Sequence, residues 1–285
     1  MSLYPADPNT GIIFRRTDIP GQNAAIPARF DRVSDTRLCT TLSNEAGVQI
    51  ATVEHLMAAL AGCEIDNVII EVNGTEVPIM DGSAEPFVFL IECAGTVHQN
   101  AARRVLRVKK PIFILEGAAE ASLVPASVDQ SALTINLNID FNNAAIGQQN
   151  LSVTVSSSSF KSEICRARTF GFLEDVEALR QSGLAKGGSL ENAVVISGGN
   201  VLNEDGLRYE DEFVRHKILD CIGDLYLAGN PLVGSFSGHR SGHDLHNKLL
   251  RQLFADPTAW EIISMDEYTE LPMQTWQAET SRAIA

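Results

Sequence analysis

Residues 210–228, with the sequence EDEFVRHKILDCIGDLYLA, predict a long core helix that ends at Gly229-Asn230-Pro231. One side of this helix is apolar, and it is formed by Val214, Ile218, Cys221, Ile222 and Leu225. His216, Asp220 and Asp224 follow one another at intervals of four, so they form a polar row on a different face. Such a row is costly on a core helix unless a metal ion, catalysis or pairing satisfies it. The stretch therefore predicts both the core and a functional site.

A second, shorter helix is predicted at residues 52–60, where apolar residues recur at helical spacing. Thr52 is its expected N-cap, which puts Glu54 and His55 in the first turn. Both helices end in Ala-Gly, carry ionisable residues and are accompanied by strand patterns. This similarity suggests a duplicated α+β unit, with the two helices meeting at one cleft. We expect a first domain at 1–102 and a second at 103–285.

Other elements follow from local patterns. Alternating or continuous apolar runs predict strands at 68–72, 105–115, 121–125, 133–140, 193–197 and 232–236. Asn73-Gly74 between the run at 68–72 and residues 75–79 predicts a β-hairpin. Further helices are predicted at 85–94, 172–183 and 243–254.

Composition restricts the classes of function. The chain has 285 residues and a formal net charge of −14, so general binding to nucleic acid or to an anionic membrane is not expected. No apolar run reaches transmembrane length. Five cysteines without a C-x-x-C pair fit a reduced, cytoplasmic compartment better than a disulfide framework. We expect a monomer that acts on a small molecule.

A metal site is the leading hypothesis for the polar row. His216 and Asp220 can supply two ligands from one helix, and His55 is the attractive third ligand because Glu54 precedes it. A carboxylate beside an activated water can take its proton during attack on a carbonyl. Spacing alone leaves it equally open that Glu54 and His55 only cap a helix.

A rival metal set consists of His239, His243 and His246, but glycines at 238 and 242 indicate a loop in which the three rings need not share a face. His243 has an alternative role as a proton donor to an amine leaving group, with Asp224 orienting it. Lys217, next to a proposed ligand, could neutralise a phosphate or an oxyanion or could simply be solvated.

Two further segments carry polar groups. In the run RARTFGF at 166–172, the hydroxyl of Thr169 could hydrogen-bond a tetrahedral oxyanion, although the run is equally compatible with a turn. Lys186-Gly187-Gly188-Ser189 lacks the P-loop spacing, so nucleotide hydrolysis has little support.

Six blocks together resemble one known family. They are TVEHL at 52–56, PIMDGS at 78–83, RARTFGF at 166–172, LNEDGLR at 202–208, the helix at 211–224 and SGH at 241–243. In this order they are similar to the zinc deacetylases of lipid A biosynthesis, the UDP-3-O-acyl-N-acetylglucosamine deacetylases. The resemblance extends from about residue 5 to the end of the chain.

The resemblance implies two similar α+β domains, each a small sheet layered with helices, with the helices packed between the two sheets. It implies Zn²⁺ held by His55, His216 and Asp220, although such a set also accepts Fe²⁺. The implied catalytic residues are Glu54 as general base, His243 as general acid, Asp224 as its orienting carboxylate and Thr169 at the oxyanion. The implied substrate contacts are Lys217, Phe170, Phe172 and Arg240. An element near residues 172–202, which begins with Phe172, would form the apolar passage for the acyl chain.

Two departures from the family pattern stand out. The family usually opens with further strands that carry a Gly-Leu-His segment, and this sequence starts after that point, so the first domain is expected to lack its N-terminal strands. Arg240 occupies a position where lysine is usual, which keeps the charge and changes the hydrogen-bond geometry toward a phosphate. The alternatives are an inactive nucleotide-sugar-binding protein of the same fold and a deacetylase of another N-acyl sugar.

Overall fold

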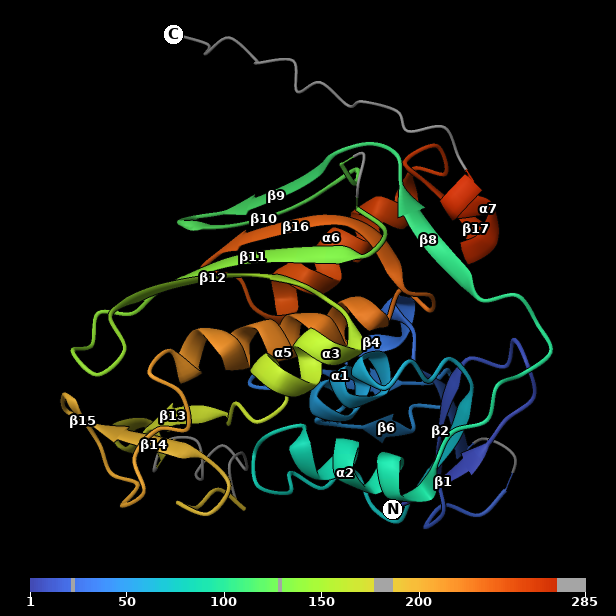
Figure 1. Ribbon diagram of the computed structural model, residues 1–285. Helices are drawn as coiled ribbons and strands as arrows, with labels where there is room; N and C mark the ends of the chain where they lie inside the picture. Colours follow the sequence, from blue (N-terminus) through green and yellow to red (C-terminus); the bar gives the residue numbers. More distant parts are fainter. Residues whose placement is uncertain (22–23, 128–129, 177–186, 271–285) are drawn as a thin grey trace, which may run out of the picture.

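The computed structural model describes residues 1–21, 24–127, 130–176 and 187–270. Its architecture is mixed α+β, and two helices from different parts of the sequence lie in the centre between sheets (Figure 1). The predicted α+β class is therefore confirmed. Within the described residues, no helix combines the length and the apolar character that crossing a membrane requires.

The N-terminal part forms the lower layer of Figure 1. Its four-stranded sheet has the order β1-β7-β2-β3, with bounds Ser2–Pro5, Val68–Val72, Ile12–Arg16 and Ala25–Pro27. A smaller sheet contains β4 (Val33–Asp35), β5 (Thr41–Ser43) and β6 (Gln49–Ile50), which follow the 3-10 turn η2 (Phe30–Arg32). The helices of this part are α1 (Glu54–Gly62) and α2 (Glu85–Ala94). The predicted α2 matches at both ends, and a proline is tolerated in its first turn.

The C-terminal part forms the upper layer around one large sheet. Its main path is β12-β11-β16-β10-β9, with bounds Gln148–Thr154, Leu133–Asp140, Leu232–His239, Ala119–Val124 and Ile112–Glu116. Two more strands extend one end, namely β8 (Arg104–Val108) on β16 and β17 (Trp260–Ser264) on β8. Every second residue of β11 is buried, so its predicted alternation is confirmed.

Most of the remaining elements of this part are helices. They are α3 (Ser157–Ser159), the π-turn η3 (Phe160–Ile164), α5 (Glu212–Tyr226), α6 (His243–Ala255) and α7 (Met265–Glu270). A three-stranded sheet contains β13 (Phe170–Phe172), β14 (Val194–Ser197) and β15 (Asn200–Val201). The helix predicted at 172–183 differs at its start, because residue 172 ends β13, and its residues 177–183 lie outside the described ranges.

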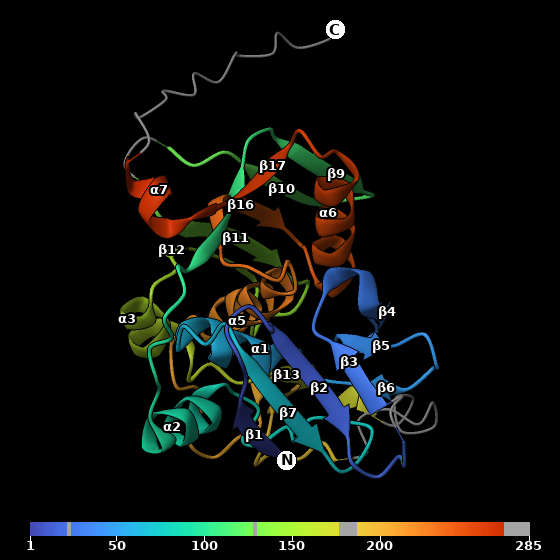
Figure 2. The same ribbon diagram turned by 90° about the vertical axis from the view of Figure 1, so that its right-hand side faces the viewer.

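The two central helices, α1 and α5, pack directly against each other (Figure 2). They approach each other closely at Gly223, where an added Cβ would lie 2.0 Å from the backbone oxygen of Glu54. Most of α5 is buried on all sides, including His216, Asp220 and Asp224. The close contact therefore brings the start of α1 against the polar row of α5.

Two local predictions are wrong. After Asn73-Gly74 the chain does not return along β7, because both edges of β7 are already paired, with β1 antiparallel and β2 parallel. Thr52 is not the N-cap of α1. It has a φ of 57°, its hydroxyl donates to Glu76, and Val53 is the capping residue.

The division into two domains stays a prediction. Residues 95–103, which join α2 to β8, contain no helix or strand, and the predicted boundary lies among them.

Candidate active site

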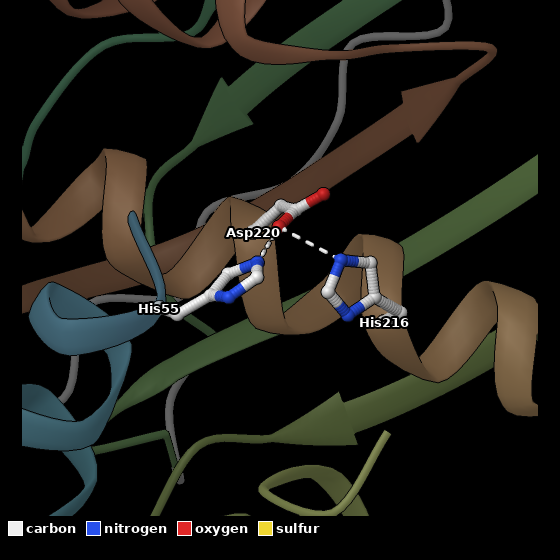
Figure 3. A group of neighbouring side chains, drawn as sticks. All are labelled: His55, His216 and Asp220. Atoms are coloured by element: carbon white, nitrogen blue, oxygen red, sulfur yellow. Dashed lines mark ion pairs between the residues drawn. The ribbon is translucent and has the colours of Figure 1, made fainter. Parts of the chain in front are cut away.

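Three donor atoms from two helices converge in the middle of the molecule. His55 lies in the first turn of α1, and His216 and Asp220 lie one turn apart on α5 (Figure 3). Oδ1 of Asp220 is 3.5 Å from Nε2 of His55 and 3.3 Å from Nε2 of His216. All three side chains are buried. The structure therefore brings together the three residues that the sequence hypothesis had joined.

The protonation states of His216 and Asp220 favour the binding of a cation. The Nδ1 of His216 lies 3.0 Å from the carbonyl oxygen of Ala167 and donates to it, so Nε2 presents its lone pair. Burial lowers the pKa of His216 to about 4, which keeps its ring neutral. Burial opposes the charge on Asp220, but His216 and Lys217 outweigh it and hold the pKa of that carboxyl well below its usual range.

The donor set also fits a small divalent metal ion by its spacing. Oδ1 of Asp220 is buried and accepts no hydrogen bond within the described residues, and its nearest charged neighbours are the two imidazoles. Tetrahedral ligands at the usual zinc distances of about 2.0–2.1 Å lie about 3.4 Å apart. The separations of 3.3 and 3.5 Å agree with this spacing.

Lys217 points toward the same group. Its Nζ donates to Oδ2 of Asp220 over 3.0 Å, on the side of the carboxylate away from the two imidazoles. Burial opposes the charge, but the carboxylate of Asp220 outweighs it and raises the pKa of Lys217. The ammonium is therefore a fixed positive charge beside the three donors.

Glu54 immediately precedes His55 and is equally buried, at 3 % exposure. Burial raises the pKa of its carboxyl, against the lowering effect of His243 and His55. One oxygen, Oε2, accepts the backbone N–H of Thr40 over 2.9 Å. A carboxylate that is held in place with a raised pKa is suited to accept a proton.

Asp224 contacts His243, the residue that it is predicted to orient. Its Oδ2 accepts from Nδ1 of His243 over 2.7 Å and from Nδ1 of His246 over 2.8 Å. Burial alone would lower the pKa of His243, but Asp224 outweighs it and raises the value to about 9. The ring of His243 is therefore an imidazolium at neutral pH. Because Nδ1 is bonded to Asp224, the proton available for donation is the one on Nε2.

The rival set of three histidines does not form. His243 and His246 both contact Asp224, and these three residues are close enough to share an ion. His239 instead lies near the end of β16, where its Nδ1 is 2.8 Å from Oδ1 of Asn138. Within the described residues, His239 belongs to neither candidate metal group.

Of the predicted residues in the segment 166–172, Phe170 contacts a buried donor, His216. Thr169 is fixed through its backbone, which donates to Gly82 and accepts from Val194. The ring of Phe170 packs edge-on against His216 at 6.3 Å between centroids. Phe172 lies on the same strand and reaches the Phe141 ring, which Phe170 also contacts. This arrangement gives an apolar wall next to the site.

A buried ion pair supports that strand. Glu212, in the first turn of α5, accepts from the backbone and the guanidinium of Arg168 and from the backbone N–H of Arg208. Burial opposes the charge of Glu212, but these donors outweigh it and lower its pKa. Sequence reasoning missed this pair, since the partners are 44 positions apart.

Arg240 precedes His243 by three residues, at a φ of 50°. Its guanidinium pairs with Asp140, and its backbone N–H donates to the carbonyl of Asn138. The side chain is 43 % exposed, so it can exchange this partner for an anion at the surface. No described contact joins it to the buried donors.

Comparison with known proteins gives a consistent result. The family model described as UDP-3-O-acyl N-acetylglycosamine deacetylase matches residues 1–255. A protein of this name from Shewanella frigidimarina is 50 % identical over 275 residues, which is 96 % of this chain and 88 % of the relative. One from Idiomarina loihiensis is 48 % identical over 286 residues, which is 99 % of this chain and 92 % of the relative.

The chain belongs to this family of deacetylases. The family resemblance seen in the six sequence blocks is thus confirmed, and with it the assignment to a family of hydrolases. A third relative, from Histophilus somni, is 50 % identical over 274 residues, or 95 % of this chain and 88 % of its own length.

Proposed function

We propose that the chain hydrolyses the 2-acetamido group of UDP-3-O-acyl-N-acetylglucosamine and releases acetate, as a step in lipid A biosynthesis. One observation carries the proposal. Two imidazoles and a carboxylate converge from α1 and α5, and the charges of this group act on the buried Glu54 and on the imidazolium of His243. We take the identity of the substrate from the names of the relatives.

His55, His216 and Asp220 would hold the metal ion. Zn²⁺ is the ion we propose, and Fe²⁺ is the alternative that the same ligand types accept. When bound, such an ion supplies Lewis acidity, which polarises an amide carbonyl and makes water more acidic. Lys217 contacts Asp220 and Phe170 contacts His216, so we assign both residues to substrate contact.

Glu54 acts as the general base. Its carboxylate takes a proton from the attacking water, and the new C–O bond gives a tetrahedral intermediate. Thr169 donates its hydroxyl to the oxyanion. His243 then gives the proton on Nε2 to the amine nitrogen as the C–N bond breaks, while Asp224 holds the other ring nitrogen. The products are acetate and the free 2-amino sugar.

Phe172 and the segment that follows it would receive the acyl chain, and Arg240 would meet a phosphate of the nucleotide. The first assignment is supported by the apolar wall around Phe141 and the second by the exposed guanidinium. The cysteines at 39, 63, 93, 165 and 221 are free thiols, which supports a reducing cytoplasmic location.

The test is acetate release by the purified, zinc-loaded chain. The acylated UDP-sugar should yield acetate and free amine in equal amounts, whereas UDP-N-acetylglucosamine without the acyl chain should react far more slowly. Calorimetric binding of the acylated substrate without acetate release would indicate an inactive binding protein. Faster release from a different N-acetylated sugar would indicate another substrate.

A further inference from the structure

Thr40 connects the two carboxylates that flank the proposed reaction centre. It lies immediately before β5 and is 2 % exposed. Its backbone N–H donates to Oε2 of Glu54 over 2.9 Å, and its hydroxyl donates to Oδ1 of Asp224 over 2.5 Å. Its carbonyl accepts the N–H of Val53, which caps α1. All three polar groups of one residue are therefore engaged at the start of α1 and on α5.

The hydroxyl has a specific effect on Asp224. Both imidazoles, His243 and His246, bind the same oxygen, Oδ2. A carboxylate held at one oxygen can still rotate about its Cβ–Cγ bond. Thr40 holds the second oxygen, so the plane of the carboxylate is fixed, and with it the direction in which His243 presents its outer nitrogen. Hydrogen bonds to charged groups of this kind are the stronger ones in proteins.

The backbone N–H has a parallel effect on Glu54. It fixes one carboxylate oxygen of the proposed base, and the same residue fixes the carboxylate behind the proposed acid. In the proposed reaction the base serves the attacking water and the acid serves the departing amine, so their separation must be held within a fraction of an ångström. Thr40 sets that separation through one rigid, β-branched side chain and its own amide.

We propose that Thr40 is a positioning residue for the acid–base pair, holding Glu54 and Asp224 in one fixed arrangement. The inference rests on the proposed function, because it assigns those two carboxylates to catalysis. Thr40 acts through Glu54 and Asp224, and none of its described hydrogen bonds reaches a metal donor. Its removal should therefore affect the rate of the chemical step and leave metal content unchanged.

The variants Thr40→Val and Thr40→Ser test the role of the hydroxyl. Valine has nearly the same shape and keeps the backbone contacts, whereas serine keeps the donor. We expect Thr40→Val to lower kcat by about tenfold to a hundredfold, the loss that follows from one charge-assisted hydrogen bond, with KM within about threefold of the parent. Thr40→Ser should remain within about threefold in both constants. Thr41→Val is the matched control, because within the described residues that hydroxyl contacts Cys39 and neither carboxylate.

A second readout does not depend on turnover. The Nδ1 proton of His243, bonded to a carboxylate, should give a low-field imidazole resonance that His243→Gln removes. We expect it in the parent and in Thr40→Ser, and its loss or upfield shift in Thr40→Val. An unchanged resonance or kcat in Thr40→Val, or equal impairment by serine and valine, would overturn the proposal. If the parent releases no acetate, the proposed function fails, and the resonance still decides whether Thr40 fixes Asp224.

Discussion

At the scale of single residues, Glu54 gives the most direct prediction. The variant Glu54→Gln keeps an oxygen that can accept the N–H of Thr40 but cannot take a proton from water. We expect kcat to fall by about 10²–10⁴-fold, the usual contribution of a general base, with metal content unchanged. Steady-state kinetics and elemental analysis measure both. The exposed Glu45→Gln is the control, and near-parental turnover of Glu54→Gln with metal bound would refute the base assignment.

His243 gives a prediction about pH. A raised pKa means that the acid form is present at neutral pH and is lost as pH rises through about 9. The basic limb of the rate–pH profile should therefore lie near that value. Asp224→Asn removes the charge that stabilises the imidazolium. The pKa of the basic limb should therefore fall by about 1–3 pH units. A basic limb that stays in place in Asp224→Asn and in His243→Gln would show that another group titrates.

The residue scale also separates what the sequence could reveal from what it could not. His216 and Asp220 could be paired from spacing alone, because residues four apart on a helix share a face. His55 could be added only as a hypothesis, since its helix might have packed elsewhere. Thr40 gave no signal at all. Its partners are 14 and 184 positions away, and a threonine before a short strand is ordinary.

At the scale of elements, the crossing of α1 and α5 depends on Gly223. A Cβ at this position would meet the oxygen of Glu54 at 2.0 Å and its carbonyl carbon at 2.8 Å, and neither backbone atom can move without the helix. We expect Gly223→Ala to lower the free energy of unfolding by about 1–3 kcal/mol and to displace His55 from its partners. Chemical denaturation and metal titration would detect both effects.

The control for this helix crossing is Gly187→Ala, since an added Cβ there meets nothing within 4 Å. Parental metal affinity and stability in Gly223→Ala would show that the two helices can separate without consequence for the site.

The buried ion pair of Glu212 and Arg168 also connects two elements, because it joins the start of α5 to the segment that precedes β13. Glu212→Gln leaves a buried guanidinium without its counter-charge. Loss of one partner of a buried pair costs about 3–5 kcal/mol, and denaturant unfolding should measure a decrease of this size. Glu210→Gln, at an exposed neighbouring position, should have little effect. Equal stability of both variants would contradict this role of the pair.

The failed hairpin shows the limit of prediction at the scale of elements. Asn73-Gly74 is a strong local turn signal. The edges of β7, however, are taken by β1, which lies far earlier in the chain, and by β2. Strand pairing over such distances depends on the assembled core, which no local pattern contains. Long elements with a regular apolar pattern, such as α5 and β11, were predicted well because their own residues determine them.

At the scale of the whole molecule, the site joins the first and second parts of the chain. His55 comes from the N-terminal layer, and His216 and Asp220 come from α5. Phe30 and Phe254 make a second connection, stacked at 4.2 Å between ring centroids. An ion held by both parts would bind the folded state and not the separated helices. Its binding free energy should therefore add to the free energy of unfolding.

Thermal unfolding with graded free zinc tests this coupling. A single site adds about 2.7 kcal/mol when free ligand is a hundred times Kd, so Tm should rise with zinc and fall on chelation. His55→Ala should abolish the increase in Tm that zinc causes, because it removes the ligand from α1. His239→Ala should retain that increase in full, since His239 bonds Asn138 and is in neither metal group among the described residues. Should His239→Ala abolish the shift and His55→Ala keep it, the ion would lie outside the contact between α1 and α5, and the two parts of the chain would not be joined through the metal.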